Sequence, residues 1–339
     1  MFTEEKITDN ITQEYISLLG EYKKFYETSI ALLNNKNSHQ SGCNAVTDLG
    51  QVSRLKYFKS EITDSPPILI IPSIINKSDI LDINPDRSFC NFLKKSHQTY
   101  LLDWSSPTDD FTLNIYIDDI INFAKILYAR HRQKLTIVGY CLGGNLAIAS
   151  YFHLAEIIDQ MIFIATPWDF SKMEYKIPSS YTHNESLKSI PAVLISLYMN
   201  SINADKIIEK YLKFPEKVLS TEDKELFFQV EYWANNGLNL PISLARMIKQ
   251  DLYDNNLAML GKWNILGKII DPKQVKIPCL VITSNNDRIV NHECARALAD
   301  LLPDSSLIES ELGHIGVIIS KKSYSKVWQP IIKWVSGIR

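Results

Sequence analysis

The hexapeptide from Gly139 to Gly144, Gly-Tyr-Cys-Leu-Gly-Gly, constrains the fold of this chain more than any other feature. Strand-forming residues over 135–138 precede it, and a helix-like run over 145–149 follows it. A strand, a sharp turn and a helix around G-x-S-x-G form a nucleophile elbow, and here Cys141 stands where serine is usual. Flanking glycines are expected because side chains beside a strained nucleophile would collide with the turn.

The predicted helix would aim its first N–H groups at the sulfur of Cys141. Such groups stabilise a thiolate and then the oxyanion that forms on attack. The motif alone also fits a buried cysteine in a glycine-rich turn between a strand and a helix. The assignment of a nucleophile therefore depends on a base and an orienting acid elsewhere in the chain.

Two later segments supply an acid and a base in the expected order. After an elbow of this kind the acid comes first and the histidine second, each in a loop that follows a late strand. Asp287 lies in the loop after a predicted buried strand over 278–283. His314 lies between two glycines after a predicted short strand over 306–310. The sequence thus predicts Asp287 as the acid and His314 as the base.

Each of these two assignments has an alternative. His292 is also close to Asp287 in the chain, although it falls at the start of the helix expected after that loop. The alternative for Asp287 is a helix N-cap or a surface turn residue. The order of the three residues along the chain favours Cys141, Asp287 and His314.

Composition limits the remaining functional classes. The chain has 339 residues, 45% of them hydrophobic, which is enough for a large core. A net charge of −2 gives no electrostatic case for binding nucleic acid or an anionic membrane. Five irregularly spaced cysteines and the lack of a secretory leader predict reduced thiols and a cytoplasmic location. We expect no metal, no cofactor and no transmembrane segment.

The order of predicted elements indicates an α/β fold with a mostly parallel sheet flanked by helices. Residues 1–50 are expected to form an amphipathic helix and a polar linker, with the helix either packing on its own domain or binding a partner. Residues 51–166 and 277–339 form the predicted core. Residues 167–276 lack strong strand patterns and are expected to form a mainly helical cap that keeps water from the site.

Six groups of segments in the chain form an ordered set of motifs: 72–77 with 80–85, 102–104 with 117–121, 139–144, 166–170, 232–233 with 239–241, and 313–317. In this order they resemble motifs of the polyhydroxyalkanoate (poly-3-hydroxybutyrate) synthases, which are cysteine-dependent polymerases with the α/β-hydrolase fold. The resemblance runs from about residue 54 to the C-terminus.

The resemblance implies an acyltransferase that polymerises (R)-3-hydroxyacyl-CoA through a covalent thioester on Cys141 and releases CoA. It implies no cofactor, since the CoA thioester is a substrate. Asp287 and His314 keep the roles of acid and base. The oxyanion would be bound by the backbone N–H groups of Leu142 and Ile75, and Asp82 would be a supporting residue near the Ile75 loop.

The implied partners are the CoA substrate and the growing polyester chain. The short segment before the core is similar to the short synthase classes, which act with a second subunit, so a second synthase subunit or a homodimer is expected, together with association with polymer granules. Two alternatives stay open. One is a thioesterase or polyester hydrolase that uses the same triad with water as acceptor. The other is a non-catalytic relative that binds the granule surface or an acyl ligand.

Overall fold

The computed structural model describes two compact units of the chain. One unit comprises His39–Ile195 and Asn236–Arg339, and the other comprises Met1–Ser38 and Ser196–Asn235. The described residues are 4–34, 41–62, 64–106, 109–179, 182, 187–202, 204–215 and 219–337, with side chains from residue 16 onward except 33 and 34. Within these residues, no helix combines the length and the apolar character needed to cross a bilayer.

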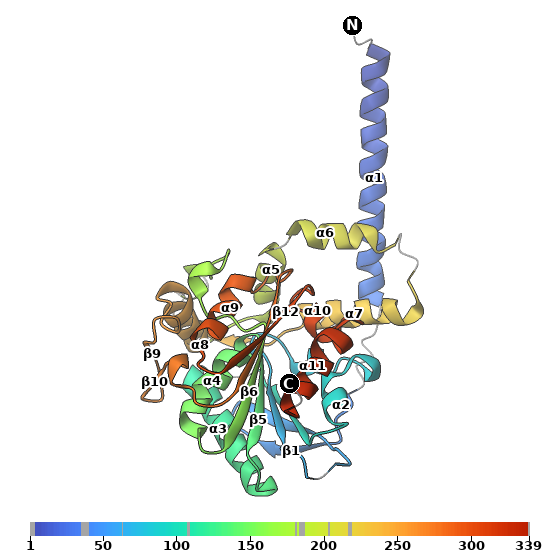
Figure 1. The fold of residues 1–339 in the computed structure, drawn as a ribbon. Coiled ribbons are helices and arrows are strands. Elements are labelled where there is room, and N and C mark those ends of the chain that lie inside the picture. The colour runs from blue at the N-terminus through green and yellow to red at the C-terminus, as the bar shows by residue number, and fades with distance from the viewer. Residues whose placement is uncertain are drawn as a thin grey trace. The chain divides into compact units, whose positions relative to one another are not determined.

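The larger unit is built on an eight-stranded sheet with the order β1-β2-β4-β3-β5-β6-β11-β12 (Figure 1). The strands are β1 (Ala45–Leu49), β2 (Ser53–Phe58), β3 (Ile68–Ile71), β4 (Thr99–Trp104), β5 (Leu135–Tyr140), β6 (Ile158–Ile164), β11 (Cys279–Ser284) and β12 (Ser305–Ser310). The β1–β2 and β2–β4 pairs are antiparallel, and the pairs from β4 to β12 are parallel. Every residue of β3, β4, β5 and β11 is buried, as expected of parallel strands covered on both faces.

Helices cover both faces of this sheet (Figure 1), which confirms the predicted α/β-hydrolase fold. The helices of the core are α2 (Phe89–Leu93), α3 (Leu113–His131), α4 (Leu142–Leu154), α9 (His292–Leu301), α10 (Gly316–Ile319) and α11 (Gln329–Val335). Shorter helical turns are η1 (Ser78–Leu81), η2 (Pro85–Arg87), η3 (Phe170–Lys172), η6 (Pro272–Gln274) and η7 (Tyr324–Trp328). The parallel strands place the loops after β3, β5, β6, β11 and β12 at one edge of the sheet.

The predicted linker was wrong in part, because residues 45–49 form strand β1. Val46 and Thr47 are β-branched residues, which favour extended backbone, and β1 pairs antiparallel with β2. The pairing covers the edge of β2, whose N–H and C=O groups would otherwise be left to solvent. Residues 35–40 of the predicted linker lie outside the described residues.

Residues 167–276, predicted as a mainly helical cap, are divided between the two units. They contain helices α5 (Ala192–Ile202), α6 (Ala204–Lys213), α7 (Thr221–Asn235), α8 (Ile242–Met247) and η5 (Ile248–Asp254), and two small sheets, β7 (Ser189–Ile190) with β8 (Leu240–Pro241) and β9 (Trp263–Ile265) with β10 (Lys268–Ile270). Only 196–235 separates from the core unit. The flanking parts stay with the core: Trp168 and Trp263 are buried against each other, with 6.5 Å between ring centroids, and the Trp168 backbone N–H donates a hydrogen bond to the Cys294 carbonyl of core helix α9 at 3.2 Å.

The smaller unit consists of the N-terminal helix and the separated part of the cap. Helix α1 (Glu4–Asn34) contacts α6 and α7 of the same unit. Phe25 packs against Tyr211 with 5.4 Å between ring centroids, and the hydroxyl of Thr28 donates a hydrogen bond to the Tyr211 carbonyl at 2.8 Å. The N-terminal helix therefore packs on a residue 183 positions away along the chain, which the sequence pattern does not indicate.

Candidate active site

Cys141 lies in the turn between β5 and α4, as the elbow motif predicts. Its backbone has φ 53° and ψ −129°, a conformation that side-chain-bearing residues rarely adopt. An added Cβ at Gly139 would lie 2.4 Å from the Cα of Gly144. Strand and helix therefore approach so closely that only glycine fits at position 139, which gives the flanking glycines of the motif their physical reason.

Gly143 brings the start of α4 against the end of β3. A Cβ at this position would lie 2.1 Å from the Ile71 carbonyl oxygen and 2.6 Å from that of Pro72. The first turn of α4, with the N–H of Leu142, therefore abuts the point where the loop carrying Ile75 leaves the sheet. This is the arrangement expected of an oxyanion site shared by two loops.

Asp287 and His314 lie in the loops after β11 and β12, and they are hydrogen-bonded to each other. The distance between the Asp287 Oδ2 and the His314 Nδ1 is 2.6 Å, and both side chains are buried. The other oxygen of Asp287 accepts the backbone N–H groups of Ile289 and Val290, each at 2.8 Å. Asp287 thus orients the imidazole, while the hydrogen bonds from Ile289 and Val290 hold its carboxylate within its own turn. It is therefore a turn residue and is also placed to act as the acid.

The imidazole of His314 also interacts with the thiol of Cys141. Burial alone would lower the pKa of His314, but the Asp287 carboxylate, the Cys141 sulfur and hydrogen bonds to both raise it well above its ordinary value. The folded protein therefore favours the protonated imidazole between a carboxylate and a sulfur. The structure brings all three predicted residues together, in an arrangement typical of an activated cysteine nucleophile.

Tyr140 supports the histidine from the strand that precedes the elbow. Its hydroxyl donates a hydrogen bond to the backbone carbonyl of His314 at 3.1 Å, and the two rings lie 5.3 Å apart. Tyr140 is 2% exposed, so this hydroxyl has to find its partner inside the protein. Sequence reasoning missed this contact, although a tyrosine at the variable position of the elbow was the available signal.

The other described histidines have partners away from this cluster. His131 contacts the Tyr100 hydroxyl, His153 the carbonyl of Ile265, and His97 the hydroxyl of Ser96. His292, the alternative base, faces Glu309 at 3.2 Å. The histidine paired with Asp287 is therefore the one that the chain order favours. His39 and His183 lie outside the described residues.

The loop after β3 has contacts at both the N–H and the carbonyl of Ile75. The N–H donates to the Ser73 hydroxyl over a long 3.4 Å, and the carbonyl accepts the N–H of Leu238 at 3.3 Å. The long first contact leaves this N–H only weakly engaged within the loop. The role of Ile75 as an oxyanion donor stays a prediction, and residues 237–238 contact the loop that carries it.

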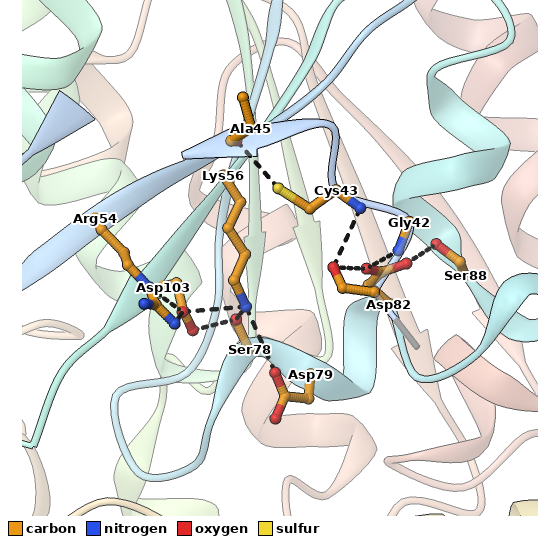
Figure 2. Close-up of polar contacts among 11 residues, drawn as sticks. Gly42, Cys43, Ala45, Arg54, Lys56, Ser78, Asp79, Asp82, Ser88 and Asp103 are labelled. Carbon is orange, nitrogen blue, oxygen red and sulfur yellow. Dashed lines mark hydrogen bonds and ion pairs between the residues drawn. The ribbon is translucent and has the colours of Figure 1, made fainter. Parts of the chain in front are cut away.

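Asp82 joins the N-terminal segment of the core to the turn before α2 (Figure 2). Its Oδ2 accepts hydrogen bonds from the Ser41 hydroxyl at 2.7 Å and the Gly42 N–H at 2.8 Å, and its Oδ1 accepts one from the Ser88 hydroxyl at 2.6 Å. These bonds explain why the carboxylate is buried. Asp82 therefore holds residues 41–42 and Ser88 together, seven residues after Ile75 in the chain.

Comparison with known proteins finds similarity to poly(3-hydroxyalkanoate) polymerase subunits. No protein-family model matches it. It is 25% identical over 295 residues to the poly(3-hydroxyalkanoate) polymerase subunit PhaC of Haloferax mediterranei. The matched region covers 81% of this chain and 60% of that protein. The subunit of the same name from Allochromatium vinosum is 26% identical over 288 residues, 80% of each chain. That of Haloarcula marismortui is 22% identical over 355 residues, 96% of this chain and 74% of that one. The resemblance expected from the motifs is confirmed.

Solved structures with a similar fold are α/β-hydrolases. An esterase from Thermogutta terrifontis superposes with a TM-score of 0.53 at 15% identity and covers 88% of this chain and 99% of its own. An enol-lactonase from Burkholderia xenovorans superposes with a TM-score of 0.51 at 14% identity, over 84% of this chain and 97% of its own. At such low identity these similarities establish the fold alone.

Proposed function

From its kinship with the poly(3-hydroxyalkanoate) polymerase subunits, we propose that this chain is an acyltransferase that polymerises (R)-3-hydroxyacyl-CoA. Cys141 carries the acyl group as a thioester, Asp287 orients His314, and His314 moves the protons. The observation that carries the proposal is the buried cluster of cysteine, histidine and aspartate in a chain similar over most of its length to such polymerase subunits.

In the first step, the Cys141 sulfur attacks the carbonyl carbon of the acyl-CoA. The bond from that carbon to the CoA sulfur breaks, and the proton held by His314 passes to the departing CoA thiolate. The negative charge that develops on the carbonyl oxygen is bound by the N–H groups of Leu142 and Ile75. The reaction exchanges one thioester for another, so the acyl group stays activated after CoA has left.

In the second step, the hydroxyl of a 3-hydroxyacyl unit attacks the acyl-Cys141 carbonyl. His314 accepts the hydroxyl proton, an ester bond forms, and the bond between the acyl carbon and the Cys141 sulfur breaks to restore the starting pair. Water would give a free acid at this point. The cap residues 237–243, which bond to the loops after β3 and β4 through Leu238–Ile75 and Ser243–Asp110, are suited to limit its access.

The partners of the reaction follow from the same proposal. They are the CoA thioester and the growing polyester chain, with a second synthase subunit or a second copy of the chain to complete the active assembly. Action on a polyester that separates from water would associate the protein with polymer granules in the cytoplasm. Sedimentation with and without polymer particles tests the granule association.

Incubation of the purified protein with (R)-3-hydroxybutyryl-CoA tests the function. We expect CoA release together with oligomeric or insoluble ester, and neither with the Cys141→Ala variant. CoA release accompanied only by free 3-hydroxybutyrate would contradict the polymerase assignment and identify a hydrolase with the same triad. Longer 3-hydroxyacyl-CoA substrates, tested in parallel, define the acyl-length range.

A further inference from the structure

The loop that carries Ile75 is fastened at both ends by consecutive residues of β4. At its start, the indole N–H of Trp104 donates a hydrogen bond to the Pro72 carbonyl at 3.1 Å. At its end, the Ser78 hydroxyl donates one to the Asp103 Oδ1 at 2.5 Å. Residues 73–77 lie between these two hydrogen bonds, so the position of the Ile75 N–H depends on both the Pro72–Trp104 and the Ser78–Asp103 contact.

The attachment at Asp103 is completed by a buried lysine from β2 (Figure 2). The ammonium of Lys56 lies 3.1 Å from the Asp103 Oδ2, 3.5 Å from the Asp79 Oδ1 and 3.4 Å from the Ser78 hydroxyl. Lys56 is 9% exposed, Asp103 is 6% and Ser78 is fully buried. The lysine therefore joins the sheet to two successive residues of the turn that follows the Ile75 loop.

The strand register explains why these groups meet. In the antiparallel β2–β4 pair, Arg54 stands opposite Asp103, and Lys56 is two residues further along β2. Side chains two apart share one face of a strand, so Arg54 and Lys56 both reach the same carboxylate. Arg54 bonds to the Asp103 Oδ2 at 2.8 Å, but its side chain is 53% exposed and its described bonds go to Asp103 alone.

The charges of this cluster depend on one another. Burial alone would raise the pKa of Asp103, but the Lys56 charge and the hydrogen bonds from Ser78, Arg54 and Lys56 lower it below its ordinary value. The carboxylate is thus kept ionised in a buried setting. Loss of the lysine would leave the Asp103 carboxylate with its exposed arginine partner and the Ser78 hydroxyl, and would remove the ion pair to Asp79 and the hydrogen bond to Ser78.

We propose that Lys56 and Asp103 are positioning residues for the oxyanion site, acting through Ser78 and Asp79 to place the N–H of Ile75 opposite that of Leu142. Neither residue touches the substrate. The proposal rests on the proposed function in one respect, since it takes Ile75 as the second oxyanion donor. It extends the site by a charged network that includes strand β2, on the opposite side of β4 from the nucleophile strand.

The test compares two reactions of Cys141 that differ in their need for an oxyanion site. Acylation by p-nitrophenyl acetate forms a tetrahedral oxyanion, and alkylation by iodoacetamide does not. Rates for both are measured on the full chain, with mass spectrometry of the Cys141 peptide to exclude reaction at other cysteines. The variants are Lys56→Met, Lys56→Arg and Ser78→Ala, with Arg54→Met as the matched control on the same carboxylate.

We expect Lys56→Met to lower the acylation rate roughly tenfold to a hundredfold, because displacing an oxyanion donor should cost less than the roughly hundredfold to thousandfold loss on removing one, with alkylation within about twofold of wild type. Lys56→Arg should restore most of the rate, and Arg54→Met should stay within about twofold. If Lys56→Met does not fold, Ser78→Ala removes the hydrogen bonds that join Ser78 to Asp103 and Lys56 without leaving an unpaired charge, and it should show a selective loss of the same kind.

Two results would overturn the proposal. One is unchanged acylation in Lys56→Met and Ser78→Ala. The other is an equal loss of acylation and alkylation, which would indicate general damage rather than a displaced donor. A wild-type protein that is acylated by p-nitrophenyl acetate but releases no CoA from any 3-hydroxyacyl-CoA would contradict the proposed function while leaving this test intact.

Discussion

The carboxylate of Asp287 and the imidazole of His314 are joined by a 2.6 Å hydrogen bond, although the residues come from different loops. Strands β11 and β12 run parallel in register, with Ser284 opposite Ser310, so the two loops leave the sheet side by side. Because the bond uses Nδ1, the other ring nitrogen is available for proton transfer at Cys141. The geometry makes Asp287 the residue that fixes the tautomer and the orientation of the base.

Replacement of Asp287 by asparagine should therefore lower CoA release by roughly two to four orders of magnitude, because the amide would favour the wrong tautomer of His314. The change keeps the size of the side chain, so the fold should be retained. Steady-state CoA release measures the effect, with Asp300→Asn on the exposed face of α9 as control. A loss of less than about tenfold would assign the acid role to another residue.

The strained backbone of Cys141 predicts an unusual order of stability among its variants. At φ 53° a glycine relieves strain of roughly 1 to 3 kcal/mol, more than the roughly 0.4 to 1 kcal/mol by which its flexibility stabilises the unfolded chain. Cys141→Gly should thus be more stable than Cys141→Ala by about 1 kcal/mol in chemical denaturation, although both are inactive. Ala149→Gly within α4 should be destabilising instead. If Cys141→Gly is the less stable of the two position-141 variants, the elbow stores no strain.

The raised pKa of His314 predicts how stability depends on pH. A group whose pKa is higher in the folded state than in the unfolded state stabilises the fold fully below the unfolded value, about 6.5. That stabilisation is lost as the pH rises through the folded value. The difference in melting temperature between wild type and His314→Gln should therefore be largest near pH 6 and shrink above neutrality. A difference that grows with pH would mean that His314 is neutral in the folded protein.

Gly143 offers a structural test of the contact between the elbow and the loop after β3. Gly143→Ala would force a Cβ to within 2.1 Å of the Ile71 carbonyl, and backbone cannot move aside cheaply. We expect little folded protein or a loss of several kcal/mol in unfolding free energy. Gly20→Ala, where nothing lies within 4 Å of the added Cβ, should be neutral or stabilising. Equal stability of the two variants would show that α4 does not abut this loop.

The sequence was informative about the sheet and the elbow because both depend on local patterns. The apolar run at 99–104 predicts β4, and the glycines around Cys141 predict a turn that the backbone conformation confirms. The order of Asp287 and His314 along the chain was enough to select them, because parallel strands bring successive loops to one edge of the sheet.

Long-range contacts were beyond sequence reasoning. Nothing local indicates that Tyr211 receives helix α1, or that residues 45–49 pair with β2. The Lys56–Asp103 pair was also missed, although one signal was available. A carboxylate within the apolar run that forms β4 has to be buried with a partner, and only the register of β2, which places Arg54 opposite Asp103 and Lys56 on the same face, shows which residues can serve.

Detection of the acyl group on Cys141 during turnover tests the central claim most directly. The protein is mixed with isotopically labelled (R)-3-hydroxybutyryl-CoA, quenched in acid within the first turnovers and digested, and the Cys141 peptide is examined by mass spectrometry. We predict that this peptide carries hydroxybutyryl units, that they pass into ester product in a chase with unlabelled substrate, and that Cys141→Ala carries none. Turnover to polyester with an unmodified Cys141 peptide, or in the Cys141→Ala variant, would contradict the account.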